Sequence, residues 1–232
     1  MPNILTHLTA AQANAYPSER EAFSTIDVEG RQLVPTGWKE FNDTVGHVAC
    51  SLEILGLRPQ ETVCVFAPNI PEILYTDFAC YRNRAIPVSI YATSSAEQVK
   101  YIINDASARA IVVGDASQYA IVRSIATECP TLRHIIAVDP GIELADDQGM
   151  SLSFADLLAR GRQASAETRS EVADRTAQAR PDDIATLIYT SGTTGEPKGA
   201  VLLHSCFDAA LAFHKARLDM LSDRETSVCF LP

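Results

Sequence analysis

The chain has 232 residues, with a hydrophobic content of 47% and a charged content of 21%, which are ordinary values for a globular protein with a substantial core. Its formal net charge of −10 argues against nonspecific binding to nucleic acid or to an anionic membrane. No apolar run approaches the ~20 residues that a membrane-spanning helix needs, and the first residues lack the charged start and apolar core of a secretion signal.

Six cysteines are scattered along the chain without a C-x-x-C pair, and several of them lie within apolar segments. We expect buried free thiols in a reducing compartment, which favours a cytoplasmic protein over a disulfide-stabilised one. No spacing of potential ligands supports a zinc site. The cysteines are Cys50, Cys64, Cys80, Cys129, Cys206 and Cys229.

The first part of the chain predicts a short helix, a strand and a long helix. Residues 2–15 have an amphipathic pattern, and residues 21–28 have a strand pattern that is closed by a turn at 29–30. The long helix begins after Gly37 and ends at Gly56. Its apolar residues recur at steps of three and four, which places them on one buried face. They are Trp38, Phe41, Val45, Val48, Leu52 and Leu55.

From residue 62 onward, strand and helix patterns alternate. Pro71 suits the first turn of one helix, and Ser95 with Gln98 forms a capping box at the start of the next. Repeated strand–helix–strand units predict an α/β fold, with a mainly parallel sheet flanked by helices on both faces. The strands are expected at residues 62–67, 85–90, 109–114 and 134–138, and the helices at 71–83, 95–105 and 117–128.

The next part of the chain predicts surface structure. Residues 139–149 are acidic and rich in turn residues, which indicates a surface loop. Residues 153–180 are polar and rich in alanine, and we interpret them as a pair of surface helices rather than a linker between domains. Beyond the segment described next, residues 206–217 predict a helix and residues 227–231 a further strand.

The residues that indicate chemistry lie between two apolar runs, 184–189 and 200–203, which predict buried strands. The connecting segment is Thr190-Ser191-Gly192-Thr193-Thr194-Gly195-Glu196-Pro197-Lys198-Gly199. Glycines allow a tight turn that brings backbone N–H groups close to a ligand, and successive N–H groups attract anions. The hydroxyl side chains add donors, and the lysine adds a positive charge suited to a phosphate. The segment therefore predicts a polyphosphate-binding loop.

Other interpretations of this segment fit less well. An ordinary turn between two strands needs only about two to five residues, whereas this segment is longer and carries four hydroxyls and a lysine. The Walker loop of phosphotransferases requires Gly before Lys and Ser or Thr after it, where Pro197 and Gly199 stand. The glycine spacing also differs from the G-x-G-x-x-G of dinucleotide-binding folds.

Residues 189–199, YTSGTTGEPKG, resemble the phosphate-binding signature of the adenylate-forming superfamily, which contains acyl-CoA synthetases, luciferases and the adenylation domains of peptide synthetases. Residues 84–95 (RAIPVSIYATSS) and 97–102 (EQVKYI) are similar to the bacterial long-chain acyl-CoA synthetase branch. The resemblance extends from about residue 25 to the last residue.

The resemblance implies that residues 1–232 are the N-terminal portion of an AMP-binding (adenylation) domain, within the large N-terminal domain of the adenylate-forming fold. In the family, the remainder of that domain and a mobile C-terminal domain follow. They carry the aromatic motif that contacts adenine, the acidic residue that helps to hold magnesium, the aspartate that binds ribose and the lysine that assists adenylation. We therefore expect a fragment that is inactive alone, and we assign no catalytic residue within it.

The resemblance also implies a reaction, in which ATP activates a long-chain fatty acid as an acyl-adenylate and coenzyme A then takes the acyl group. Thr190, Ser191, Thr193 and Thr194, with the backbone of Gly192 and Gly195, would hold the β- and γ-phosphates, and Lys198 would neutralise the departing pyrophosphate. One of the hydroxyl side chains would contact Mg²⁺, and the sequence does not select which one.

Two further functions stay open from the sequence: a stand-alone nucleotide-binding regulatory module, and an enzyme that adenylates another carboxylate. The oligomeric state and any peripheral contact with a membrane are also left open. We expect His204 to be structural rather than part of an acyl site, and Arg82 and Arg84 to be solvated.

Overall fold

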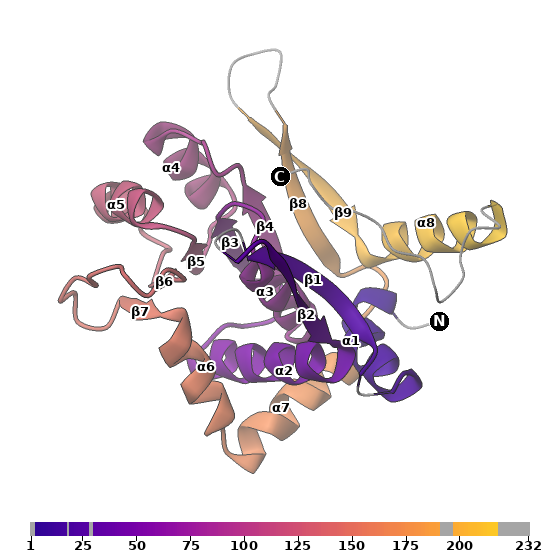
Figure 1. The fold of residues 1–232 in the computed structure, drawn as a ribbon. Coiled ribbons are helices and arrows are strands. Elements are labelled where there is room, and N and C mark those ends of the chain that lie inside the picture. Colours follow the sequence, from indigo (N-terminus) through magenta and orange to yellow (C-terminus); the bar gives the residue numbers. More distant parts are fainter. Residues whose placement is uncertain (1–2, 18, 28–29, 191–196, 218–232) are drawn as a thin grey trace.

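The structure is a computed structural model that describes residues 3–17, 19–27, 30–190 and 197–217. Its centre is a five-stranded sheet in the order β4-β3-β5-β6-β7, in which every neighbouring pair of strands is parallel (Figure 1). The strands are β3 (Thr62–Phe66), β4 (Ile86–Ile90), β5 (Ala110–Val113), β6 (His134–Ala137) and β7 (Ser151–Ser153). The predicted parallel α/β sheet is confirmed, and β7 was missed because three residues carry too little pattern.

Helices cover both faces of this sheet because successive side chains of each strand point to opposite sides. Val63 and Val65 of β3 pack in one core cluster, and Cys64 and Phe66 of the same strand pack in the other. The first cluster is covered by α2 (Trp38–Ile54), α3 (Pro71–Arg82), α6 (Phe154–Arg162) and α7 (Ala166–Ala177). The second is covered by α4 (Ala96–Asp105) and α5 (Ala116–Ile125), which continues into the 3-10 turn η1 (Ala126–Glu128).

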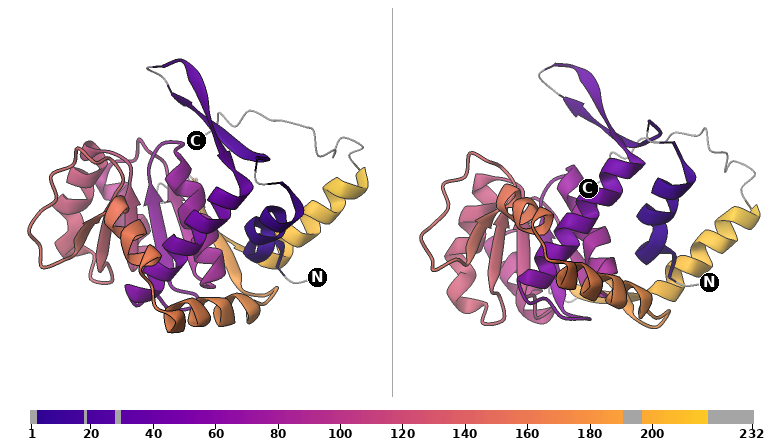
Figure 2. Two further views of the ribbon diagram at one scale, coloured as in Figure 1. Left: turned by 60° about the horizontal axis from the view of Figure 1, so that its bottom comes forward. Right: turned by 90° about the horizontal axis from the view of Figure 1, so that it is seen from below.

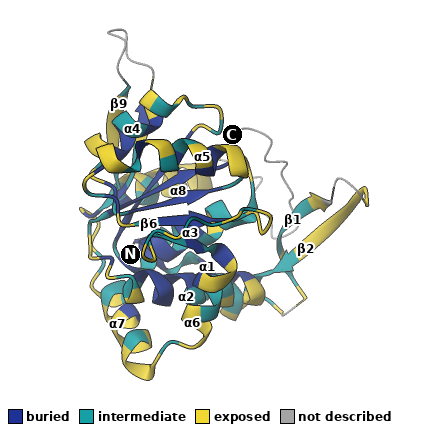
Figure 3. Cartoon of the chain, turned by 90° about the vertical axis from the view of Figure 1, so that its left-hand side faces the viewer, coloured by how far each residue is buried: buried dark blue, intermediate teal, exposed yellow. Residues whose placement is uncertain are grey.

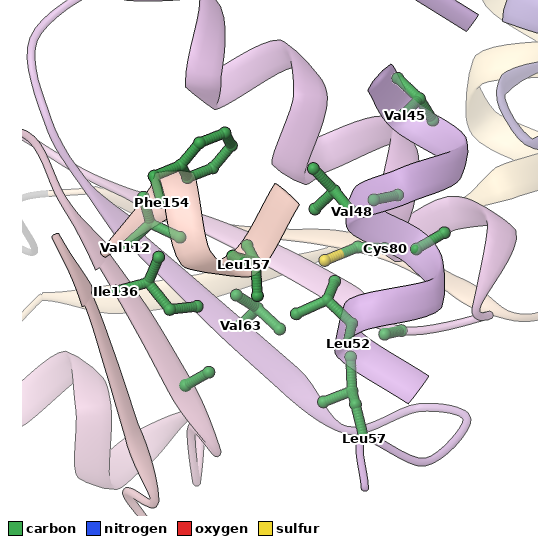
Figure 4. Packing of buried hydrophobic residues seen from close by; sticks show 14 of the residues in the cluster. Val45, Val48, Leu52, Leu57, Val63, Cys80, Val112, Ile136, Phe154 and Leu157 are labelled. Carbon is green, nitrogen blue, oxygen red and sulfur yellow. The ribbon is translucent and has the colours of Figure 1, made fainter. Parts of the chain in front are cut away.

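The first cluster joins residues that lie far apart in the sequence. Figure 4 shows Leu52 of α2 and Leu157 of α6 meeting Val63 and Ile136 of the sheet. Gly161 of α6 allows the two helices to approach closely, because a Cβ at this position would lie 1.8 Å from the backbone oxygen of His47. Burial follows the strands and the inward helix faces, while the outer faces are exposed (Figure 3).

Two helix starts show how local chemistry sets the element boundaries. The predicted capping box of Ser95 and Gln98 is present at α4. A second box was missed at α5, where the Asp115 side chain accepts from the Gln118 backbone and the Gln118 side chain accepts from the Asp115 N–H. Such a cap fixes the first turn, and it explains why α5 begins one residue before the predicted start.

The N-terminal part adds a helix, α1 (Ile4–Ala15), and an antiparallel hairpin of β1 (Glu21–Asp27) and β2 (Gln32–Gly37). This hairpin projects away from the sheet (Figure 2). β2 was not predicted, because its first four residues are exposed and carry no buried alternation. Trp38, placed in the core from the sequence, is half-buried and packs on Phe41 with ring centroids 6.0 Å apart.

The chain ends its described course in the antiparallel pair β8 (Ile184–Thr190) and β9 (Lys198–Leu203), followed by α8 (His204–Arg217). The strand predicted at residues 227–231 lies outside the described residues. No helix in the described ranges is long and apolar enough to cross a membrane. Of the five cysteines described, all are free and four are buried, but Cys206 is exposed, contrary to the expectation of buried thiols.

Candidate phosphate-binding site

The predicted phosphate loop connects β8 and β9. In the register of this hairpin, Thr190 is paired with Lys198 at the end next to the connecting loop, and both residues are exposed. The other five predicted binding residues, Ser191, Gly192, Thr193, Thr194 and Gly195, lie outside the described residues. The structure thus places two of the seven, and it brings these two together across the hairpin.

The hairpin lies beside β4, the edge strand of the parallel sheet (Figure 1). The Thr186 hydroxyl donates to the backbone oxygen of Pro87 in β4, at 2.8 Å. A proline in a strand has no N–H to donate to a neighbouring strand, which suits β4 to the edge of the sheet. This bond ties the middle of β8 to the sheet.

Near the loop end of the hairpin, Tyr189 holds β8 to the second core cluster. Its ring is buried, and its hydroxyl donates to Oδ2 of Asp105 at 2.6 Å. Gly199 is the register partner of Tyr189, and a Cβ there would lie 3.1 Å from the tyrosine Cζ. The glycine of the PKG sequence therefore lets the Tyr189 ring pack closely beside Lys198, a role that the sequence alone does not reveal.

The base of the hairpin is held by an ion pair between Arg84 and Asp183. Arg84 Nε donates to Asp183 Oδ2 at 2.8 Å and Nη2 donates to Oδ1 at 2.9 Å, while the Asp183 side chain is only 2% exposed. The Arg180 backbone N–H donates to the same carboxylate at 2.9 Å. Burial alone would raise the pKa of Asp183, but the donors from Arg84 and Arg180 outweigh it and hold the pKa below its ordinary value.

The same junction reaches both strands of the hairpin. The backbone oxygen of Asp183 accepts from the N–H of His204, which follows β9, at 3.1 Å. The side-chain oxygen of Gln60 accepts from the Ile184 N–H at 2.9 Å, and the Gln60 amide donates to the Arg84 backbone oxygen at 2.9 Å. The start of β8 and the end of β9 are therefore fixed to the loop before β3 and to Arg84, two residues before β4.

Two arginines differ from the expectation that they are solvated. Arg84 is largely buried in the pair described above. Arg82 donates to the hydroxyl of Thr9 at 2.7 Å, and its burial lowers the pKa of the guanidinium. Both side chains are held by partners distant in sequence, which their surroundings in the chain do not reveal.

His204 is buried at the start of α8, where its ring packs on Tyr81 with centroids 5.5 Å apart. Burial lowers its pKa, partly opposed by the charges of Asp183 and Asp208, so the imidazole is neutral near pH 7. Its Nδ1 has no hydrogen-bond partner in the part of the chain that the structure describes. The surroundings are those of a residue that packs between elements.

The positive charge at the loop end of the hairpin suits an anion. Lys198 is exposed and forms no ion pair within the described ranges, so its charge is available to a ligand. No group of three His, Cys, Asp or Glu side chains that could hold a metal ion occurs among the described residues. Thr190 and Lys198 present a hydroxyl and a positive charge of the kind that contacts phosphate, and the described residues assign no protein ligand to Mg²⁺.

Comparisons with known proteins identify relatives of the whole chain. A model of the AMP-binding enzyme family matches residues 9–232. The peroxisomal long-chain acyl-CoA synthetase 6 of Arabidopsis thaliana is 31% identical over 182 residues, which are 76% of this chain and 24% of that protein. A long-chain-fatty-acid–CoA ligase of Mycobacterium bovis is 33% identical over 192 residues, which are 79% of this chain and 29% of that protein.

A solved structure shares the fold. An anthranilate–CoA ligase in complex with anthranoyl-AMP aligns with 92% of this chain and 37% of its own length, with a TM-score of 0.72 and 22% identity. The chain spans about a quarter of the length of the curated relatives it matches. Because the family model matches nearly the whole sequence, the chain belongs to the AMP-binding enzyme family.

Proposed function

We propose that this chain supplies the phosphate-binding part of an ATP-dependent acyl-CoA ligase that acts on a long-chain fatty acid. The observation that carries the proposal is the register pairing of Thr190 with Lys198 at the loop end of an anchored hairpin, where the Lys198 side chain forms no ion pair with another described residue. The family match and the long-chain acyl-CoA ligases among the relatives support the choice of reaction and of substrate.

The proposed reaction has two steps. A carboxylate oxygen of the fatty acid attacks the α-phosphorus of ATP, the bond from that phosphorus to the bridging oxygen breaks, and pyrophosphate leaves. The deprotonated thiol of coenzyme A then attacks the acyl carbon, and AMP departs with the electrons of the carbon–oxygen bond. Mg²⁺ would offset phosphate charge in the first step. Such chemistry depends mainly on positioning and on preorganised donors and cations.

The residues of this chain would act on the departing group. The hydroxyls of Thr190, Ser191, Thr193 and Thr194 and the backbone N–H groups of Gly192 and Gly195 would hold the β- and γ-phosphates. Lys198 would neutralise charge that builds up on pyrophosphate. A hydrogen bond to a charged group contributes about 1.5–3 kcal/mol, so the loss of this lysine should slow pyrophosphate release by more than about tenfold.

We further propose that residues 1–232 form the N-terminal portion of an AMP-binding domain and do not complete the reaction alone. The chain carries a recognisable phosphate-binding segment, and the resemblance assigns none of its residues to adenine, ribose or the thiol. Orientation of both reactants can contribute up to about 7–11 kcal/mol to lowering a barrier, and this contribution requires both to be held.

The test is to mix the purified chain with ATP, Mg²⁺ and palmitate, to measure pyrophosphate release, and then to add coenzyme A and measure thioester. We expect turnover no higher than that of Lys198→Ala. Turnover well above this control would contradict the fragment proposal and would locate a complete site within 232 residues. If the native reading frame continues past Pro232, the full-length product should activate long-chain acids in preference to other acids. A full-length product that binds ATP but shows no turnover with any acid would instead favour a regulatory module.

A further inference from the structure

A cavity of about 250 Å³ lies at the end of the parallel sheet where its strands begin. The residues that immediately precede or begin three neighbouring strands line it: Glu61 before β3, Arg109 before β5, and Arg133 with His134 at the start of β6. Arg58, from the loop after α2, completes its polar lining. Three leucine side chains from the end of α2 and the same loop line the rest.

The cavity is positive in a strongly negative chain. Three arginines and one glutamate line it, which gives a formal charge of +2 when His134 is neutral, while the whole chain carries −10. The single carboxylate is already engaged: Glu61 Oε1 accepts from Arg109 Nε at 2.9 Å, and Oε2 accepts from the Arg58 backbone N–H at 2.9 Å. Glu61 therefore orients Arg109 and leaves the charge of Arg58 unpaired within the described part of the chain.

We propose that this cavity binds a small phosphate dianion, either free inorganic phosphate or the terminal phosphate of a phosphomonoester. Arginine presents several N–H donors in a planar fork that matches phosphate oxygens. Arg58 would provide one contact, and Arg109 is held in place by Glu61. Arg133 would contribute the N–H groups left after its Nη1 donates to the backbone oxygens of Pro130 at 2.7 Å and Leu132 at 3.1 Å.

The site is distinct from the β8–β9 hairpin. No residue of the hairpin lines the cavity. Active-site ligands of open α/β sheets bind as a rule at the carboxyl ends of the strands, whereas this cavity lies at the end where the strands begin, so it is separate from that region. Burial and the charges of Arg160 and Arg133 lower the pKa of His134, so the positive charge of the site at pH 7 comes from its arginines. A phosphate here would act as a regulatory or stabilising ligand.

The test is a titration of the 232-residue chain with inorganic phosphate, at constant ionic strength kept with chloride, followed by backbone amide chemical shifts. Arg58→Gln and Arg133→Gln each remove one charge from the cavity, and Arg58→Lys keeps the charge but loses the fork. Arg31→Gln is the matched control, because Arg31 is exposed on the β1–β2 turn and does not line the cavity. Thermal unfolding without phosphate checks that each variant is folded.

We expect saturable shifts near Arg58 and Arg133 and about tenfold weaker binding in each glutamine variant, because each loses a charge-assisted bond. Arg58→Lys should bind with intermediate affinity, and Arg31→Gln should bind like the wild type. A response that does not saturate, or that Arg31→Gln weakens equally, would reduce the cavity to a solvated basic surface and overturn the proposal. Binding abolished by Lys198→Ala would overturn it as well, since the phosphate would then sit on the hairpin. Neither failure would affect the proposed ligase activity.

Discussion

Replacing Arg84 by alanine removes the guanidinium from a carboxylate that is almost fully buried. The side chain of Asp183 is 2% exposed and that of Arg84 is 14% exposed, so neither partner is well hydrated in the fold. Removal of one partner of a buried ion pair costs about 3–5 kcal/mol, because the remaining charge stays buried. The Arg180 N–H still donates to Asp183, so we expect a loss of about 3 kcal/mol in the free energy of unfolding.

A second substitution at the same position separates the ion pair from the backbone. Arg84 has a φ of 56°, in the left-handed region that favours glycine. Arg84→Gly and Arg84→Ala both lose the ion pair, but only alanine retains the backbone strain. We therefore expect Arg84→Gly to be more stable than Arg84→Ala by about 1 kcal/mol.

The assay is urea denaturation of the wild type and both variants, at pH 7 and at progressively lower pH. Because the pKa of Asp183 in the fold lies below its ordinary value of 3.8, its stabilisation is present above that pH and is lost as the pH falls through the folded pKa. The cost of Arg84→Ala should therefore be full at pH 7 and shrink below about pH 4. A cost under about 1 kcal/mol at pH 7, or a cost independent of pH, would refute the role of this ion pair.

Three further predictions concern packing and buried charge. Gly161→Ala should lower the free energy of unfolding by at least about 2 kcal/mol, measured by urea denaturation, because its Cβ would lie 1.8 Å from the His47 oxygen. Gly199→Ala should cost about 1–2 kcal/mol and weaken ATP binding in a calorimetric titration, because its Cβ would press on the Tyr189 ring. Burial raises the pKa of Asp77 from 3.8 to about 7, so the neutral form is favoured in the fold and wild-type stability falls as the pH rises through this range. Asp77→Asn should remove that dependence, and its melting temperature relative to the wild type should be higher at pH 8 than at pH 5. An equal difference at both pH values would contradict the burial of an ionisable carboxyl.

The parallel sheet could be predicted because its strands are apolar and its helices amphipathic, and both patterns depend on local sequence. The capping box of Ser95 and Gln98 is equally local, since all its atoms lie within one turn. The β2 strand escaped prediction because an exposed hairpin lacks the buried alternation that marks a strand.

The support of the candidate site could not be predicted in the same way. Asp183 precedes an apolar strand like many surface acids, and its partner Arg84 is 99 residues away in the chain. The positive φ of Gln60, 62°, likewise has no marker in the sequence. A glycine directly opposite a tyrosine in a predicted hairpin could have indicated the contact of Gly199 with Tyr189, but only once the register was known.

The central claim is that the β8–β9 hairpin binds the phosphates of ATP, and a titration of the chain with MgATP followed by backbone amide shifts tests it most directly. The shifts should concentrate at Thr190 and Lys198, and Lys198→Ala should weaken binding by about tenfold through the loss of one charge-assisted bond. Lys215→Ala, which removes an exposed lysine from α8, is the matched control and should bind like the wild type. Binding that both lysine variants leave unchanged, or shifts confined to residues outside the hairpin, would contradict the claim.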